Sequence, residues 1–257
     1  MLNKTNYRSI KFQTRTHNRY WWFRFSGAEY VPALFDLLTD TEWDIIEQWY
    51  ADSEIKFQGP GECSVPAMSM LLGLITGNNI SRMVQLGHYI GFSTILLGFI
   101  FRRMGHKGAI FSVDIDPKAT EYTQSWLNMA GLNDHVSLLV SDSADSTVPS
   151  NAINYLGGSP QLIFIDSSHQ YKHTIQELDL WHEHLAPGGF IFLHDVSLFA
   201  AQFDSTQQGG VRTALSEWLK VRNVDVSMIN SFCDGTQRVD ELTYRDGCGL
   251  GIIQKPF

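Results

Sequence analysis

The chain has 257 residues, and 44% of them are apolar, enough to build a sizeable core, which argues against global disorder. Its formal net charge is −8, from 19 basic and 27 acidic residues. A nucleic-acid partner is therefore not expected, because such proteins usually carry an extended basic face.

Residues 1–62 are rich in aromatic side chains, and a helix is indicated within them. The stretch "TDTEWDIIEQWYADS" begins with Thr39 or Thr41 followed by acids, a helix-capping pattern, and then repeats apolar residues at helical intervals. Two interpretations of this N-terminal helical segment stay open. It packs on the main domain, or it forms a lid or oligomer surface that walls a substrate pocket. The second interpretation is compatible with a homo-oligomer.

The most apolar run of the chain is "LGHYIGFSTILLGFIF", which extends from Leu86 to Phe101. It is shorter than the ~18 to 20 apolar residues that a membrane span needs, and it contains His88 and Ser93. A buried strand followed by a buried helix explains it better. No apolar, signal-like stretch opens the sequence, so neither secretion nor a membrane partner is expected.

From residue 63 to residue 257, apolar runs alternate with helical stretches, which predicts parallel βαβ units. The expected strands are Arg82–Leu86, Ala109–Val113, Val136–Val140, Gln161–Ile165, Phe190–Leu193, Val224–Ile229 and Gly249–Gln254. The expected helices between them are Ser93–Met104, Lys118–Ala130, His173–Glu183 and Gly210–Val221. The sequence thus predicts an α/β, Rossmann-like doubly wound sheet of seven strands, mostly parallel, with an antiparallel edge strand formed by the last pair.

The cysteines are odd in number and widely separated, at Cys63, Cys233 and Cys248. No C-x-x-C pair is present, so the spacing indicates neither a zinc site nor a disulfide framework. Free thiols are typical of a reducing compartment, and a cytoplasmic location is the expectation.

Ligands of open α/β sheets bind at the carboxyl ends of the strands, so the residues after each strand form the candidate site. The first strand leads into Gln85, Gly87, Tyr89 and Gly91, followed by a helix whose free N–H groups begin near Ser93. Tyrosine at position 89 and isoleucine at 90 break the G-x-G-x-x-G fingerprint, and no Walker lysine follows. The loop therefore predicts a nucleoside ligand without phosphates.

The other strand ends carry acidic, hydroxyl and imidazole side chains: Asp114 after the second, Asp142 and Ser143 after the third, Asp166 and His169 after the fourth, and His194 and Asp195 after the fifth. An acid at the second strand end is well placed to accept hydrogen bonds from both hydroxyls of a ribose. A carboxylate and a hydroxyl at the third suit an adenine amino group. Each signal is weak alone, and their shared order is the stronger one.

Together these residues resemble class I S-adenosylmethionine-dependent methyltransferases of the catechol O-methyltransferase-like branch. In that branch the first strand reads E-[IL]-G-x-x-x-G-[YF]-S, which "QLGHYIGFS" resembles, and "LIFIDSSHQY" and "LAPGGFIFLHDVS" resemble its fourth and fifth strands. The likeness covers about Met83 to Val196 and, more weakly, Gly209 to Leu219. It is greatest to metal-dependent natural-product sugar O-methyltransferases of the macrolide sugar type.

The resemblance implies S-adenosylmethionine as the cofactor. The residues it implies as cofactor contacts are Gln85, Gly87, Tyr89, Gly91, Ser93, Asp114, Asp142, Ser143 and Asp166. It also implies a divalent metal, Mg²⁺ or Mn²⁺, at Asp166, His194 and Asp195, with His169 as the general base.

Two residues depart from the family pattern. Gln85 replaces a glutamate, which removes a charge from the cofactor loop. His194 replaces an acid at the metal position, and this favours Mn²⁺ or Fe²⁺ over Mg²⁺, which prefers oxygen ligands. His194 and Asp195 are consecutive, so both reach one ion only if the strand has already turned between them.

The expected function is O-methylation of a hydroxyl on a small molecule or secondary metabolite, with His169 and Asp166 as catalytic residues. Methyl transfer is mainly a positioning task, but an aliphatic hydroxyl must also lose its proton, for which histidine is suited. Two alternatives remain open. One is an N-methyltransferase or a metal-independent methyltransferase, and the other is a non-catalytic, methyltransferase-like scaffold subunit.

Overall fold

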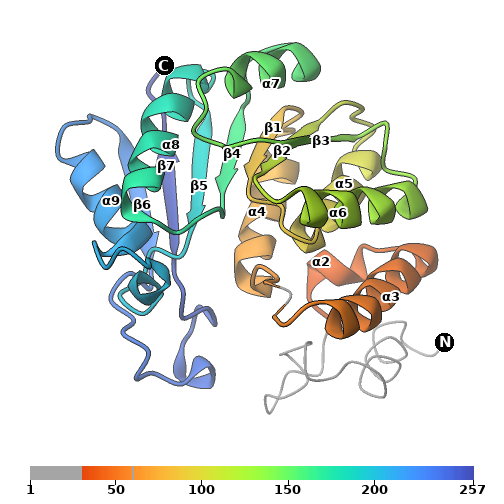
Figure 1. The fold of residues 1–257 in the computed structure, drawn as a ribbon, viewed down its shortest axis with the longest axis horizontal. Coiled ribbons are helices and arrows are strands. Elements are labelled where there is room, and N and C mark those ends of the chain that lie inside the picture. Colours follow the sequence, from red (N-terminus) through yellow and green to blue (C-terminus); the bar gives the residue numbers. More distant parts are fainter. Residues whose placement is uncertain (1–30, 60) are drawn as a thin grey trace.

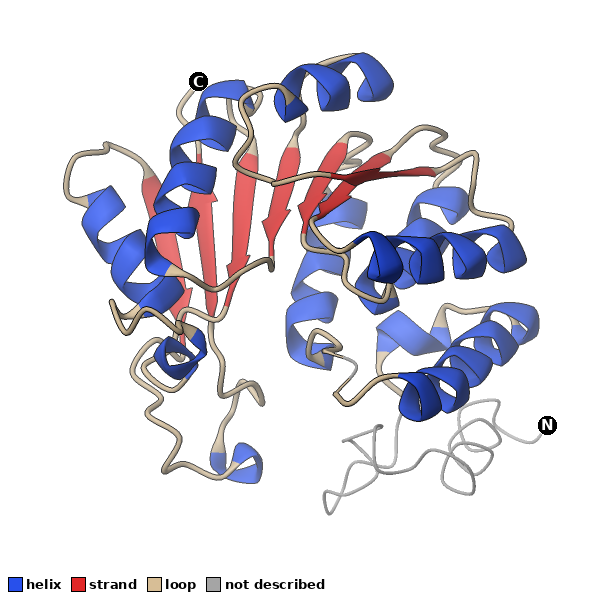
Figure 2. Ribbon diagram, viewed as in Figure 1, coloured by secondary structure: helices blue, strands red, loops and turns tan. Residues whose placement is uncertain are grey.

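A computed structural model describes residues 31–59 and 61–257 of the chain (Figure 1). The aromatic residues expected to form part of a lid or oligomer surface before position 31 lie outside the described residues. The described part is one mixed sheet with helices on both faces (Figure 2).

All seven expected strands are present in the described residues, each to within one residue at either end. They are β1 (Met83–Leu86), β2 (Ile110–Asp114), β3 (Val136–Val140), β4 (Leu162–Ile165), β5 (Phe190–His194), β6 (Asp225–Ile229) and β7 (Leu250–Gln254). The strand order is β3-β2-β1-β4-β5-β7-β6, and β7 runs antiparallel to both β5 and β6. The predicted fold class is confirmed, with the antiparallel strand one position in from the edge.

Alternate residues of the strands supply two separate apolar clusters, one on each face of the sheet. In β1, Met83 joins the cluster beneath helices α5 (Phe92–Arg103) and α6 (Pro117–Ala130). Val84 and Leu86 join the cluster beneath α7 (Val148–Leu156), α8 (Tyr171–His184) and α9 (Gly210–Leu219). Both clusters are fully buried at these positions, which explains why the strands are almost uniformly apolar. The chain reverses its direction of winding between β1 and β4, and this is where a ligand crevice is expected.

The helices that the sequence predicts are present to within two residues at either end. The helices of the described residues are α2 (Ala33–Asp36), α3 (Asp40–Lys56), α4 (Val65–Gly77), α5 (Phe92–Arg103), α6 (Pro117–Ala130), α7 (Val148–Leu156), α8 (Tyr171–His184) and α9 (Gly210–Leu219), with short 3₁₀ turns η2 (Ala200–Phe203) and η3 (Val239–Glu241). Helices α4 and α7 were not expected. The first is apolar around most of its surface and so has no clear period, and the second is a short helix of nine residues.

Helix α3 confirms the capping pattern read from the sequence. The Thr39 hydroxyl accepts from the Glu42 amide, and the Glu42 carboxylate accepts from the Thr39 amide, so the box is complete. Glu42 is buried and also pairs with Arg102 and Arg103 of α5, at 2.6 and 2.8 Å. The core runs without a break across the expected boundary at 62–63, so residues 31–59 of this segment pack on the main domain.

Candidate active site

A pocket of about 570 Å³ opens at the carboxyl ends of β1, β2, β3 and β4. Its walls are residues 87–93, 113–116 and 166–169, together with Gly61, Asp142, Ser143 and His173. The first four of the strand ends singled out in the sequence therefore meet around one cavity, at the crevice that the strand order predicts, whereas His194 and Asp195 of the fifth do not line it.

The turn after β1 depends on two glycines for a reason the sequence did not reveal. Gly87 has φ of 85°, and a Cβ atom there would lie 2.1 Å from the backbone oxygen of Asp166. Gly91 has φ of 90° and is the N-cap residue of α5. A Cβ atom there would lie 2.7 Å from the Thr123 side chain. The glycines thus allow the chain's own neighbouring segments to approach, in addition to leaving room for a ligand.

Asp114 holds the glycine turn in place from the end of β2. One carboxylate oxygen accepts from the amides of His88 and Tyr89, at 3.0 and 2.7 Å, and the other accepts from the Asp116 amide at 2.9 Å. A carboxylate has about four acceptor positions, so these bonds leave capacity for a ligand hydroxyl. Tyr89 itself has a positive φ of 43° and lines the pocket while 38% exposed.

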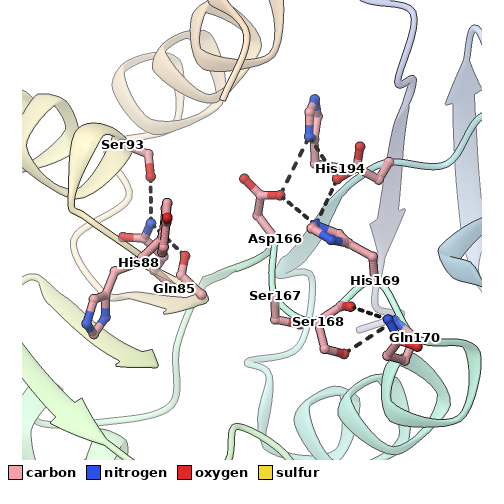
Figure 3. A network of polar contacts seen from close by, with 12 residues as sticks. Gln85, His88, Ser93, Asp166, Ser167, Ser168, His169, Gln170 and His194 are labelled. Carbon is pink, nitrogen blue, oxygen red and sulfur yellow. Dashed lines mark hydrogen bonds and ion pairs between the residues drawn. The ribbon is translucent and has the colours of Figure 1, made fainter. Parts of the chain in front are cut away.

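Gln85 lies behind the turn and does not line the pocket. Its amide nitrogen donates to the Ser93 hydroxyl at 2.7 Å and to the Gly87 carbonyl at 3.2 Å, and its oxygen accepts from the Thr94 hydroxyl at 2.9 Å (Figure 3). The side chain is fully buried. The prediction that Gln85 lines the cofactor site therefore does not hold in the structure: Gln85 orients the turn, and any effect on a ligand passes through Gly87 and Ser93.

His88 is a structural residue inside the same turn. Its two ring nitrogens lie 3.0 Å from the Ser112 hydroxyl and 2.9 Å from the Thr120 hydroxyl. Burial lowers the pKa of His88 to about 4, so the ring is neutral at pH 7. It ties the turn to β2 and α6, and no proton transfer needs to be assigned to it.

Behind the wall of the pocket lies a buried acid that the sequence analysis missed. Glu177 of α8 is fully buried and accepts from the hydroxyls of Ser143, at 2.5 Å, and Ser167, at 2.8 Å. His173, one helical turn earlier, lies 2.9 Å from Asp142 and 3.5 Å from Glu177. The spacing of four residues between His173 and Glu177 was the one available sequence signal.

This arrangement makes the stability of the protein depend on His173 between pH 6.5 and 9. Glu177 above all, with Asp142, raises the pKa of His173 from 6.5 to about 9, although burial opposes the shift. The interactions of protonated His173 with Glu177 and Asp142 therefore contribute fully to the free energy of unfolding below pH 6.5, and this contribution is lost as the pH rises through 9.

We expect His173→Gln to lower the free energy of unfolding at pH 6, by on the order of 2 kcal/mol, and to change it little at pH 9.5. Denaturant unfolding of both proteins across this range measures the difference. A loss of equal size at every pH would mean that packing, not charge, is what His173 contributes.

The second half of the site is a cluster of two histidines and two aspartates at the ends of β4 and β5. The ring of His169 lies 3.0 Å from Asp195 and 3.5 Å from Asp166, measured from Nε2 to a carboxylate oxygen. His194 lies 3.3 Å from Asp195 and 3.6 Å from Asp166, measured from Nδ1. Figure 3 shows the two imidazoles on either side of the Asp166 carboxylate.

The backbone at Asp195 explains how consecutive residues reach one point. Asp195 has φ of 63°, so the strand has already turned after His194 and their side chains meet. His169 also has a positive φ, of 58°. Non-glycine residues in this region are uncommon and are enriched where function constrains the backbone.

The cluster contains more potential metal ligands than the sequence indicated. Donor atoms of Asp166, His169 and Asp195 lie within 4.8 Å of one another, and so do donor atoms of Cys63, Asp166 and His194. Both groups share Asp166, and the predicted set of Asp166, His194 and Asp195 is divided between them. Cys63 carried no sequence signal, because it precedes a helix that was not predicted.

The two carboxylates favour the protonated form of the imidazoles. Burial lowers the pKa of His169, but hydrogen bonds to Asp166 and Asp195 outweigh it and raise that pKa to about 10. Burial would likewise raise the pKa of Asp195, yet His194 and His169 hold it well below its usual range. Without a cation the cluster therefore balances its charge with protons on nitrogen, and a bound divalent cation would compete with those protons.

Residues 84–196 match a family described as "Methyltransferase domain". The human protein named "Transmembrane O-methyltransferase" is 25% identical over 131 residues, which cover 51% of this chain and 43% of that protein. The chain spans about half the length, or less, of the curated relatives it matches. In the described residues, 31–59 and 61–257, no helix is both long and apolar enough to cross a bilayer.

Solved structures share the fold. The cofactor-bound Rv0187 structure from MTB superposes with a TM-score of 0.65 and 20% identity, covering 82% of this chain and 89% of that one. An O-methyltransferase from Bacillus cereus in complex with SAH gives 0.63 and 16%, covering 95% and 99%. Together with the family match, these structures confirm the resemblance to class I methyltransferases of the catechol O-methyltransferase-like branch.

Proposed function

We propose that this chain, whose residues 84–196 form a methyltransferase domain, transfers the methyl group of S-adenosylmethionine to a hydroxyl group of a small molecule. The observation that carries the proposal is that one pocket is lined by Asp114 and by the pair Asp166 and His169. A nucleoside-binding acid and a candidate base thus face the same cavity. The cofactor-bound and SAH-bound structures of similar fold support the choice of ligand.

The cofactor would lie along the pocket from the glycine turn to α8. The remaining acceptor position of Asp114 suits a ribose hydroxyl, and Asp142 and Ser143 suit the adenine amino group. The sulfonium end then lies toward Asp166 and His169, because these line the other side of the cavity. No phosphate-binding glycine pattern is present to extend the ligand further.

In the reaction, a hydroxyl oxygen of the acceptor attacks the methyl carbon as the carbon–sulfur bond breaks. Sulfur keeps the bonding electron pair, which yields S-adenosylhomocysteine and a methyl ether. The hydroxyl proton moves to His169 Nδ1, while Nε2–H of the same ring donates to Asp166 and Asp195. The two carboxylates then stabilise the imidazolium, in the same way that they raise its pKa at rest.

We propose that a divalent cation binds among Asp166, His194 and Asp195, because Nδ1 of His194 lies 3.6 and 3.3 Å from the two carboxylates. Two carboxylates and an imidazole suit Mn²⁺ or Fe²⁺ better than Mg²⁺. Such an ion would supply charge that lowers the pKa of a nearby hydroxyl. The ion would offset part of the negative charge of Asp166 and Asp195. The pKa of His169 would then lie closer to the working pH, and the ring would serve better as a base.

Binding of the cofactor is the first test. Chelator-treated protein titrated in a calorimeter should bind S-adenosylmethionine and S-adenosylhomocysteine, and not NAD. Asp114→Asn should weaken this binding by about 10- to 100-fold, since it removes charge-assisted hydrogen bonds worth roughly 1.5–3 kcal/mol. Thermal unfolding of the free variant separates loss of binding from loss of the turn.

Asp134→Asn is the matched control, because Asp134 lies on the surface, paired with Lys107, and should leave the affinity unchanged. If Asp114→Asn binds as tightly as the wild type, Asp114 does not hold the ribose. Binding without turnover on any hydroxylated acceptor would favour the scaffold interpretation. Turnover that survives chelation would favour the His169–Asp195 pair acting without a metal.

A further inference from the structure

The Cys63 thiol reaches the catalytic cluster from outside the matched domain. It lies just before α4, is 4% exposed, and has its sulfur within 4.8 Å of donor atoms of Asp166 and His194. Ligand atoms around one ion with bonds of about 2.0–2.3 Å are separated by at most about 4.6 Å. The three donors are therefore already close to the spacing that a single ion requires.

His194 is held in the orientation of a metal ligand. Its Nε2 donates to Asp246, at 2.9 Å, so Nδ1 is directed at Asp166 and Asp195. Metal-binding histidines usually donate their second ring nitrogen to a carboxylate in this manner, which fixes the tautomer. Asp246 is itself buried, and its other oxygen accepts from the Cys248 amide at 2.9 Å.

The same Asp246 also positions the segment that carries Cys63. The hydroxyl of Ser64, the next residue, donates to Asp246 at 2.8 Å and accepts from the Ala67 amide as the cap of α4. One carboxylate thus orients His194 directly and holds the neighbour of Cys63. This shared support argues that thiol and imidazole are placed together, and not by chance.

A polar group near the cluster lacks a protein partner. The Tyr244 hydroxyl is buried and makes no hydrogen bond within the described residues. Tyr244 lies close to Asp246, because the Asn230 amide donates to the backbone carbonyls of both residues at 2.7 Å. An unsatisfied buried hydroxyl of this kind is what a site has when a bound water or ion completes its hydrogen bonding.

We propose that Cys63 is a thiolate ligand of the metal site and that, with His194, it makes the site select Zn²⁺, Fe²⁺ or Co²⁺ over Mg²⁺. Soft thiolate and imidazole donors favour these ions, whereas Mg²⁺ requires an oxygen shell. The inference rests on the cation assigned to the proposed function, and extends it by naming a further ligand and the class of ion.

Cobalt(II) reports thiolate ligation directly, without cofactor or acceptor. Reduced, chelator-treated full-length protein is titrated with Co²⁺ and followed by electronic absorption. We expect a near-ultraviolet thiolate-to-cobalt charge-transfer band that saturates, and that a large excess of Mg²⁺ does not remove. Absence of the band, or its loss on addition of Mg²⁺, overturns the proposal.

Variants assign the sulfur. Cys63→Ser should lose the charge-transfer band and keep weaker visible bands from cobalt held by histidine and carboxylate. Cys248→Ser is the matched control, because that thiol lies beside Asp195, and it should keep the band. The reverse pattern, or a band that survives in Cys63→Ser, excludes Cys63 as the ligand.

A second variant leaves the proposed ligands intact. Asp246→Asn should weaken cobalt binding by about 10- to 100-fold while the band still appears at saturation, as expected for a residue that orients a ligand. Unchanged cobalt affinity would contradict the orienting role. Because no methyl donor is present, a missing band leaves methyl transfer standing, and a band without cofactor binding would reject the proposed function alone.

Discussion

Gly87→Ala is expected to destabilise the protein and to abolish measurable cofactor binding. The added Cβ would lie 2.1 Å from the Asp166 backbone oxygen, at a φ of 85° that alanine adopts only with strain. Strain and overpacking together cost about 3 kcal/mol, which lowers the melting temperature by roughly 6–12 °C in a chain of this size. Thermal unfolding with and without S-adenosylhomocysteine measures both effects.

Gly73→Ala supplies the control within the same fold. Gly73 lies on the exposed side of α4, and nothing lies within 4 Å of the Cβ position. Alanine there should be neutral or stabilise by up to about 1 kcal/mol, because it favours the helix. A Gly87→Ala protein as stable as Gly73→Ala would mean that the β1 and β4 loops do not approach as described.

His169→Ala is expected to reduce methyl transfer by about 10²- to 10⁴-fold, the usual contribution of a general base. Its affinity for S-adenosylhomocysteine should stay within a few-fold of the wild type, since the ring belongs to the acceptor side of the pocket. Steady-state kinetics gives the first quantity and calorimetry the second. Wild-type turnover in the variant would show that another group removes the proton.

His169→Gln separates proton transfer from structure. Its amide can still donate to Asp166 and Asp195, so the two carboxylates keep a partner, but it cannot accept a proton. We expect the same kinetic loss with a smaller effect on stability than in His169→Ala. His184→Ala, in the last turn of α8 and outside the pocket lining, should match the wild type in both.

The pH profile of the wild type carries a further check on the base. With the carboxylates uncompensated, the pKa of His169 is about 10, so the neutral base is scarce at pH 7. An activating cation should shift the rising limb of kcat/KM to lower pH, because it offsets the carboxylate charge. A limb that does not move with the cation would place the ion away from Asp166 and Asp195.

The sheet was predictable because its information is local. Buried strands such as "MVQL" and the capping residues Thr39 and Glu42 leave short-range patterns that structure formation follows directly. Parallel connectivity then brings strand ends together, so the sequence predicts that Asp114, Asp142 and Asp166 share one pocket, as they do.

The rest of the site depends on tertiary contacts that short patterns do not contain. Whether Gln85 faces the ligand or the interior depends on its hydrogen bonds to the hydroxyls of Ser93 and Thr94, which lie behind the turn. The meeting of His194 and Asp195 depends on a positive φ at a residue that is not glycine. Cys63 joins the cluster because of where the start of α4 lies in the fold. The sequence does not predict α4, since this helix has no clear amphipathic period.

The hydrogen bond between Ser64 and Asp246 joins positions that are 182 residues apart. Chains are synthesised from the amino end, so Cys63 and His194 emerge from the ribosome well before Asp246, the carboxylate that orients His194 and holds Ser64. That carboxylate lies just before β7, which must also insert between β5 and β6. Ordered assembly of the proposed metal site would therefore be a late event of biogenesis, and tight capture of an ion would wait until β7 has been made.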